Sequence, residues 1–117
     1  MKLTVAEIER VILYEVMVDC YTEEEANMGW AIYMEENVNF PFEAEYFVKM
    51  KSGKNEWRKV SVVNSQTDPS SFDGGEWYVE IELDEFIVSA KLSELRYIKA
   101  EEETMRALQV WNHKDRY

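Results

Sequence analysis

Cysteine and glycine are scarce in this sequence, and long apolar runs are missing. The single cysteine, Cys20, cannot form an internal disulfide, which favours a reducing compartment and excludes a multi-cysteine zinc site. No stretch approaches the roughly 20 uninterrupted apolar residues of a membrane-spanning helix. The start of the chain lacks the pattern of a secretory signal. We therefore expect a soluble, cytoplasmic protein.

Positive charge is also in short supply. The chain carries 13 Lys and Arg against 24 Asp and Glu, a formal net charge of −11. An acidic surplus of this size repels phosphate backbones, so we expect neither nucleic-acid binding nor binding to an anionic membrane. Cations and basic protein surfaces are the partners that this charge favours.

The shortage of bases is concentrated in two spans, which are rich in aromatic and branched apolar residues and so belong to a folded surface. Between Val11 and Val48 no base occurs, and the acids are Glu15, Asp19, Glu23, Glu24, Glu25, Glu35, Glu36, Glu43 and Glu45. Between Val60 and Ala90 no base occurs either, and the acids are Asp68, Asp73, Glu76, Glu80, Glu82, Asp84 and Glu85.

The remaining composition is that of one ordinary domain. The chain has 117 residues, of which 46% are hydrophobic and 14% aromatic, enough for one core. We find neither an internal repeat nor a linker. The sequence therefore predicts a single domain over residues 1–117, and we expect a monomer.

Two helices are predicted before residue 40. Thr4 followed by Glu7 is a capping box that begins a helix over 4–19, and Thr22 with Glu25 repeats the pattern for a helix over 22–38. The first helix carries Ile8, Val11, Ile12 and Val16 at helical spacing, and in the second we expect Met28, Ala31 and Ile32 on the apolar face. Pro41 prevents continuation of the second helix.

After Pro41 the apolar period changes to two, which predicts strands over 43–50, 57–64, 77–83 and 86–92. A turn at 52–55 and a reversal at Asp84-Glu85 connect neighbours, and residues 65–75 form one long loop. The segment "ELRYI" is a turn of helix or a fifth strand. A last helix begins near Ala100, with Met105, Leu108 and Trp111 on one face.

This order predicts an α+β fold, in which two N-terminal helices and one C-terminal helix pack on a small curled antiparallel sheet or barrel. The aromatics of the helical segments and of the Phe-Pro-Phe stretch are expected in the core. These are Trp30, Tyr33, Phe40, Phe42 and Trp111.

The block "GWAIYMEENVNFPFEAE", together with "KLSELRYIKAEEETMRALQVW", resembles the cyanobacterial CcbP-type calcium-binding proteins. The most specific part of the resemblance is the order Glu-Glu-Asn, two residues, then Phe-Pro-Phe, in residues 35–42. The resemblance implies an acidic, cytoplasmic protein that binds Ca²⁺ on its surface and serves calcium buffering or signalling. It also implies a small β-barrel of the Src-homology-3 type flanked by helices.

The chemistry of residues 35–39 agrees with a calcium site. Glu35 and Glu36 end a helix, at the negative end of its dipole, where two carboxylates are unfavourable without a cation. Asn37 and Asn39 add amide oxygens, which Ca²⁺ also accepts. The alternative is a solvated acidic helix face. Asn39 is neutral where relatives are expected to carry an acid, which weakens a site there.

The loop and the strand that follows it supply a second set of candidate ligands. An EF-hand is excluded, because a twelve-residue loop ending at Glu80 would begin with Pro69, which has no carboxylate. The acids could still hold an ion in another arrangement, or the loop acids could serve turn chemistry and the strand acids solubility. The candidates are Asp68, Asp73, Glu76, Glu80, Glu82 and Asp84.

Enzyme chemistry is poorly supported. Cys20 and His113 lie in different elements with no third orienting group, and Gly74-Gly75 is a lone pair in a turn. We expect a non-catalytic protein that buffers or senses Ca²⁺ through surface carboxylates. The alternative is an acidic interaction module that docks a basic protein partner, and a hydrolase is a distant third.

Overall fold

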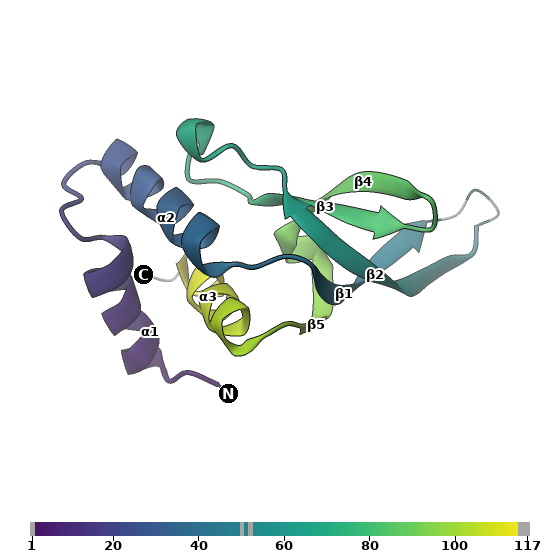
Figure 1. Ribbon diagram of the computed structural model, residues 1–117, viewed down its shortest axis with the longest axis horizontal. Helices are drawn as coiled ribbons and strands as arrows, with labels where there is room; N and C mark the ends of the chain where they lie inside the picture. The colour runs from purple at the N-terminus through teal and green to yellow at the C-terminus, as the bar shows by residue number, and fades with distance from the viewer. Residues whose placement is uncertain (1, 50, 52, 115–117) are drawn as a thin grey trace. The chain divides into compact units, whose positions relative to one another are not determined.

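A computed structural model describes residues 2–49, 51 and 53–114 (Figure 1). Its contacts divide the chain into two compact units. The helical unit consists of Met1–Asn39, Asp68–Gly75 and Glu101–Tyr117, and the strand unit consists of Phe40–Thr67 and Glu76–Ala100. The prediction of one domain over 1–117 stays a prediction.

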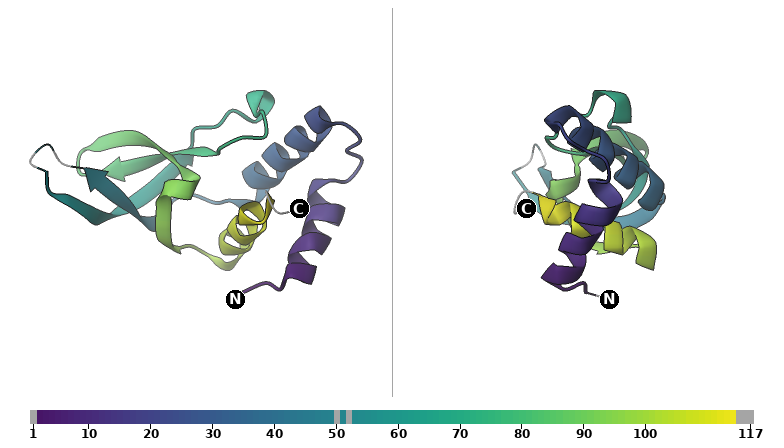
Figure 2. Two further views of the ribbon diagram at one scale, coloured as in Figure 1. Left: turned by 180° about the vertical axis from the view of Figure 1, so that it is seen from behind. Right: turned by 90° about the vertical axis from the view of Figure 1, so that its left-hand side faces the viewer.

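The helical unit contains α1 (Val5–Val11), the π-helical turn η1 (Ile12–Val16), α2 (Glu23–Asn37) and α3 (Glu102–Asn112). Figures 1 and 2 show the three helices packed against one another, with α1 and α2 both against α3. The capping box at Thr4 is confirmed, because its hydroxyl accepts from the Glu7 N–H at 3.2 Å and the Glu7 carboxylate accepts from the Thr4 N–H at 3.1 Å. The predicted helix over 4–19 is confirmed from Val5 to Val16, although it changes from an α-helix to the π-helical turn η1 at Ile12, and it is wrong only after Val16, where the helix ends.

The core of the helical unit is formed by side chains of α1, η1, α2 and α3. Trp30 packs edge-on against Tyr33 and Trp111, with ring centroids 6.3 and 5.7 Å apart. The expectation for α2 was wrong in part: Ala31 is buried, but Met28 and Ile32 remain 47% and 46% exposed. The helix instead buries Trp30, Ala31, Tyr33 and Met34.

The strand unit is one antiparallel sheet with the order β4-β3-β2-β1-β5. The strands are β1 (Phe42–Lys49), β2 (Asn55–Ser65), β3 (Tyr78–Leu83), β4 (Phe86–Lys91) and β5 (Leu95–Lys99), which settles "ELRYI" as a strand apart from its first residue. Among the described residues β4 and β5 are edge strands that do not pair with each other. The sheet is therefore not closed, and the barrel of the Src-homology-3 type is not confirmed.

The predicted period of two is confirmed in the sheet. In β3, Val79 and Ile81 are buried, Glu80 between them is half-buried, and Glu82 beyond them is exposed. Part of the predicted turn at 52–55 and the end of the predicted first strand lie outside the described residues. The long loop contains the short 3₁₀ helix η2 (Pro69–Ser71), and η3 (Leu92–Glu94) connects β4 to β5.

Candidate functional site

The end of α2 carries the first candidate ligands. Thr22 begins this helix by accepting a hydrogen bond from the Glu25 N–H at 3.1 Å, and the helix ends at Asn37. Glu35 and Glu36 are exposed in the last turn, which holds no basic residue. The Asn37 amide donates to the Tyr33 carbonyl at 2.8 Å, which leaves its own oxygen available as an acceptor. The unfavourable placement of two carboxylates at the negative end of a helix is confirmed.

Asn39 lies beside the first turn of α3, 62 residues further along the chain. Its backbone N–H donates to the hydroxyl of the buried Thr104 at 2.9 Å. Its side-chain amide nitrogen contacts the Glu101 carboxylate and lies 3.4 Å from Oε2 of Glu103. The Thr104 hydroxyl in turn donates to Oε1 of Glu101 at 3.2 Å. We call these four residues the Asn39 cluster.

The Asn39 cluster brings together two carboxylates, an amide and a hydroxyl within the helical unit. The amide N–H faces both carboxylates and so lies where a positive charge is favoured. Rotation of the amide by half a turn would present its oxygen to the same place. Glu101 and Glu103 are not among the ligands predicted from the sequence, although the run Glu101-Glu102-Glu103 next to a helix start was a signal of an acidic site.

The two loop acids have local hydrogen-bond donors. Oδ1 of Asp68 accepts from the N–H and the hydroxyl of Ser70 at 3.0 and 2.8 Å, and these bonds lower the pKa of Asp68. Oδ1 of Asp73 accepts from the Gly75 N–H at 2.9 Å. Both contacts are the turn chemistry that the sequence left open as an alternative.

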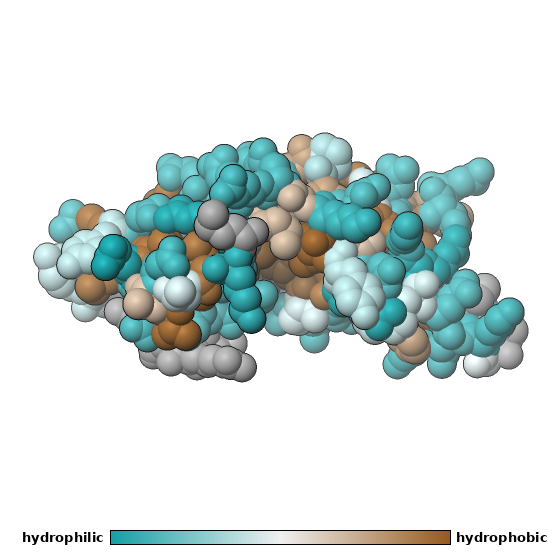
Figure 3. All heavy atoms as spheres, turned by 90° about the horizontal axis from the view of Figure 1, so that it is seen from below, coloured by the Kyte–Doolittle hydropathy of each residue, from teal (hydrophilic) through white to brown (hydrophobic). Residues whose placement is uncertain are grey.

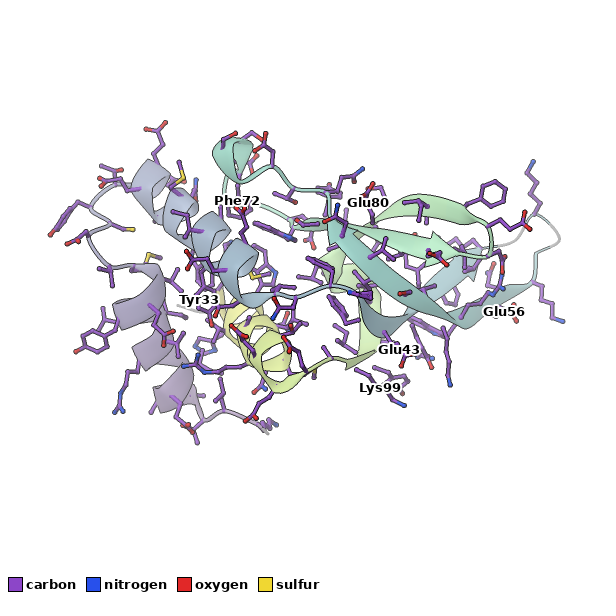
Figure 4. All side chains as sticks on the ribbon, viewed as in Figure 1. Tyr33, Glu43, Glu56, Phe72, Glu80 and Lys99 are labelled. Atoms are coloured by element: carbon purple, nitrogen blue, oxygen red, sulfur yellow. The ribbon has the colours of Figure 1, made fainter. Side chains whose placement is uncertain are left out.

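The strand unit contains four of the predicted ligands, Glu76, Glu80, Glu82 and Asp84. Glu80 and Glu82 share the face of β3 opposite the buried apolar residues, as predicted (Figure 4 labels Glu80). Asp84 does not share that strand face, because β3 ends at Leu83 and Asp84 lies in the turn with φ 56°. Glu76 accepts a hydrogen bond from the Ser93 N–H at 3.1 Å.

An open groove of about 550 Å³ lies in the strand unit, lined by residues of β1, β2, β3 and β5. Glu43 pairs in register with Ser61 and Lys99, and Ser61 pairs with Glu82 (Figure 4 labels Glu43 and Lys99). The backbones of the two glutamates are therefore two strand spacings apart, roughly 10 Å, with Ser61 between them. Lys59 and Lys99 line the same groove. These ammonium groups compete with any metal ion for the carboxylates.

Within residues 2–49, 51 and 53–114, no group of three or more His, Cys, Asp or Glu side chains is arranged to hold a metal ion. The oxygen donors are of the type that Ca²⁺ prefers. They occur singly or in pairs, so a bound ion would take further ligands from amides, backbone carbonyls or water.

Cys20 and His113 show no sign of a catalytic pair among the described contacts. The Cys20 thiol contacts the carbonyl oxygens of Val16, Val18 and Glu25. Desolvation, and then the nearby Glu25 and Asp19, raise the pKa of this thiol, which disfavours the nucleophilic thiolate. His113 Nε2 lies 3.9 Å from a carboxylate oxygen of Glu9 instead.

None of the helices in the described part of the chain has the length and apolar character needed to cross a membrane.

The comparisons with known proteins agree with the resemblance seen in the sequence. The model of the CcbP family, described as calcium binding, matches residues 9–114. The crystal structure of Anabaena CcbP is 26% identical with a TM-score of 0.76, and the match covers 96% of this chain and 91% of that one. A calcium binding protein in the calcium-binding form is 26% identical with a TM-score of 0.69, covering 95% and 94%. No curated protein gives a significant match.

Proposed function

This chain belongs to the CcbP family of calcium-binding proteins, and from that premise we propose that it is a non-catalytic, cytoplasmic protein that buffers or senses Ca²⁺ through surface carboxylates. Two features support the proposal. The family match covers almost the whole chain, and the formal charge of −11 leaves a deficit that a hard divalent cation relieves. The proposed function rests above all on the family match.

The first proposed site is at the end of α2 and the start of α3. Glu35, Glu36, Asn37 and Asn39 are the ligands predicted from the sequence, and the Asn39 cluster adds Glu101 and Glu103. A Ca²⁺ ion there would neutralise the carboxylates of Glu101 and Glu103, which share the Asn39 amide as a neutral donor, while Glu101 also accepts from the Thr104 hydroxyl. On binding Ca²⁺, the side-chain amide of Asn39 would rotate by half a turn. Its oxygen would then face the carboxylates and the ion in place of its N–H.

The N-terminal end of α3 favours negative charge at Glu101 and Glu103, whereas the C-terminal end of α2 disfavours it at Glu35 and Glu36. The first pair is therefore stable without metal. The second pair gains more from a cation. A second site, or completion of the first, is proposed from the acids of residues 68–84: Asp68, Asp73, Glu76, Glu80, Glu82 and Asp84.

Exposed ligands without a preformed cage bind weakly. We expect a Kd on the order of 10⁻⁷ to 10⁻⁴ M, the range of calcium sensors or weaker. Because the attraction of the acidic surface is screened by ions, added salt should weaken binding.

The test is isothermal calorimetry with Ca²⁺ and with Mg²⁺ on the metal-free protein. The variants are Glu101→Gln with Glu103→Gln, and Glu35→Gln with Glu36→Gln. Glu102→Gln is the matched control, because Glu102 lies between the two cluster glutamates in the chain but has no contact with Asn39 among the described residues. Each pair should weaken Ca²⁺ binding about tenfold, a loss of roughly 1.4 kcal/mol, and the control should stay within about twofold.

Two results would contradict the proposal. If Ca²⁺ gives no heat and leaves the melting temperature unchanged, the protein does not bind calcium. If Ca²⁺ and Mg²⁺ bind equally and only in the millimolar range, the acidic surface is not a calcium site and its role is to dock a basic partner.

A further inference from the structure

A groove of about 540 Å³ lies within the helical unit, between the segment 15–20 and the first half of α2. We call it the η1–α2 groove. None of the predicted calcium ligands lines it, and the proposed function does not use it. All its lining residues come from the span of sequence that contains no Lys or Arg.

The floor of the groove depends on a close approach between two backbones. A Cβ atom added to Gly29 would lie 2.4 Å from the carbonyl oxygen of Val16 and 3.1 Å from Sγ of Cys20. Only glycine therefore lets α2 lie this close to η1. The side chain of Val16 is buried beneath the groove at 3% exposure.

The walls of the groove are apolar and open to solvent. Val18, Met28 and Ile32 line it and remain 53%, 47% and 46% exposed. Figure 3 shows hydrophobic residues reaching the surface among hydrophilic ones, so exposed apolar residues alone are not distinctive. The distinctive feature here is that three such side chains line one concavity.

The rim of the groove is acidic. Glu15 is paired with Arg106 at 3.1 Å. Asp19, Glu24 and Glu25 also line the groove, and in the described part of the chain no salt bridge neutralises them. The groove therefore combines an apolar interior with a net negative rim.

We propose that the η1–α2 groove docks a basic amphipathic helix of a partner protein. The apolar face of such a helix would cover Val18, Met28 and Ile32, and its Lys and Arg side chains would meet Asp19, Glu24 and Glu25. Charge complementarity selects this occupant. An anionic membrane surface would be repelled by the rim, and a second copy of the chain would bring its own charge of −11.

The docking surface is independent of calcium binding, so the test is run in EGTA. The probe is a fluorescein-labelled helical peptide of about 18 residues, five turns, built from Leu and Lys. Its comparison peptide has Glu in place of every Lys. Fluorescence anisotropy measures the Kd for each, at low salt and at roughly 0.15 M ionic strength. We expect the Lys peptide to bind, and to bind more weakly in salt, and the Glu peptide not to bind.

Two double variants of the groove, each with a matched double variant elsewhere as its control, locate the site. Met28→Ser with Ile32→Ser removes exposed groove walls, and Phe86→Ser with Ile87→Ser is the control, because it removes apolar side chains of β4 that are exposed even more (69% and 54%). Asp19→Asn with Glu24→Gln removes rim charge, and Glu56→Gln with Glu85→Gln, two exposed glutamates outside the groove, is its control. Each groove pair should weaken Lys-peptide binding about tenfold, and each control pair less than about threefold. Circular dichroism verifies that each variant is folded.

The proposal is overturned if groove and control pairs weaken binding equally, which would mean diffuse attraction to the acidic surface. It is also overturned if the Glu peptide binds as tightly as the Lys peptide. If the wild type sediments as a dimer that Met28→Ser with Ile32→Ser dissociates, the occupant is a second copy. If zwitterionic vesicles bind and the peptide does not, the occupant is a lipid surface. Either result replaces the proposed partner.

Discussion

Asp84 receives two hydrogen bonds from the guanidinium of Arg58, from Nη2 to Oδ1 at 2.6 Å and from Nη1 to Oδ2 at 2.9 Å. The pair joins the turn after β3 to the first half of β2. Both carboxylate oxygens of this candidate calcium ligand therefore have a positively charged partner. An ion at Asp84 would have to displace the guanidinium.

The Arg58 guanidinium holds the pKa of Asp84 below its usual value of 3.8. A depressed pKa in the folded state contributes stability that is present above the unfolded pKa and is lost as the pH falls through the folded pKa. Arg58→Gln should therefore raise the pKa of Asp84 towards 3.8, as measured by a carboxyl NMR titration. The pKa of Asp68, which is lowered by Ser70, should stay unchanged. An unmoved Asp84 titration would contradict the pairing.

Asn39→Asp should have opposite effects with and without calcium. In EGTA the new carboxylate lies beside Glu101 and Glu103, and repulsion on the order of 1 kcal/mol should lower the melting temperature. With Ca²⁺ the added charge should strengthen binding roughly fivefold. Calorimetry and thermal melts measure both effects. Asn55→Asp, exposed at the start of β2, is the control and should leave Ca²⁺ affinity unchanged. Loss of affinity in Asn39→Asp would contradict a site at this cluster.

Gly29→Ala should destabilise the protein although alanine favours helices. Its Cβ would meet the Val16 carbonyl oxygen at 2.4 Å, and backbone cannot move aside as a side chain does. We expect a loss of about 1–3 kcal/mol in the free energy of unfolding, measured in urea. Gly75→Ala is the control, because its Cβ would approach only the Asp73 carboxylate. Equal stability of Gly29→Ala and wild type would disprove the close approach.

Tyr33 is buried at 3% exposure, and its hydroxyl has no hydrogen-bond partner among the described residues. Desolvation raises the pKa of Tyr33 to about 12. The positive charge of Arg106 opposes this shift, and the negative charges of Glu15 and Glu103 add to it. The raised pKa contributes stability that is present below pH 10 and is lost as the pH rises through about 12.

Tyr33→Phe removes that hydroxyl without leaving a partner unpaired. We expect a change of less than about 1 kcal/mol in the free energy of unfolding, or a small gain. In an alkaline absorbance titration the variant should lack the tyrosine that ionises last. Tyr14→Phe, at an exposed position, should retain it. A loss of several kcal/mol in Tyr33→Phe would reveal a hydrogen bond at this hydroxyl.

Local signals in the sequence predicted the elements well. The capping residues Thr4 and Thr22 placed two helix starts, because a cap depends only on residues within one turn. The face of α2 could not be predicted in the same way. Apolar side chains occupy most of the run from Met28 to Met34, so periodicity did not distinguish the buried Tyr33 from the exposed Ile32.

The candidate site was predictable only where it is local. Glu35, Glu36 and Asn39 are neighbours in the sequence. The contact of Asn39 with Glu101 spans 62 residues, and that of Arg58 with Asp84 spans 26. Such pairs depend on how the helices pack and on strand register, which composition and spacing do not determine. For the same reason, the sequence does not reveal which carboxylates already accept hydrogen bonds from other groups of the protein.

The open edge of the sheet has a consequence for handling the protein. Within the described residues β4 pairs only with β3, and it exposes Phe86 and Ile87 beside unpaired backbone groups. Near neutral pH, mutual repulsion between molecules of charge −11 opposes edge-to-edge association. Close to the isoelectric point of about 4.5 that repulsion vanishes. Acidification should therefore precipitate the protein through β4, and a lysine at position 87 should delay it.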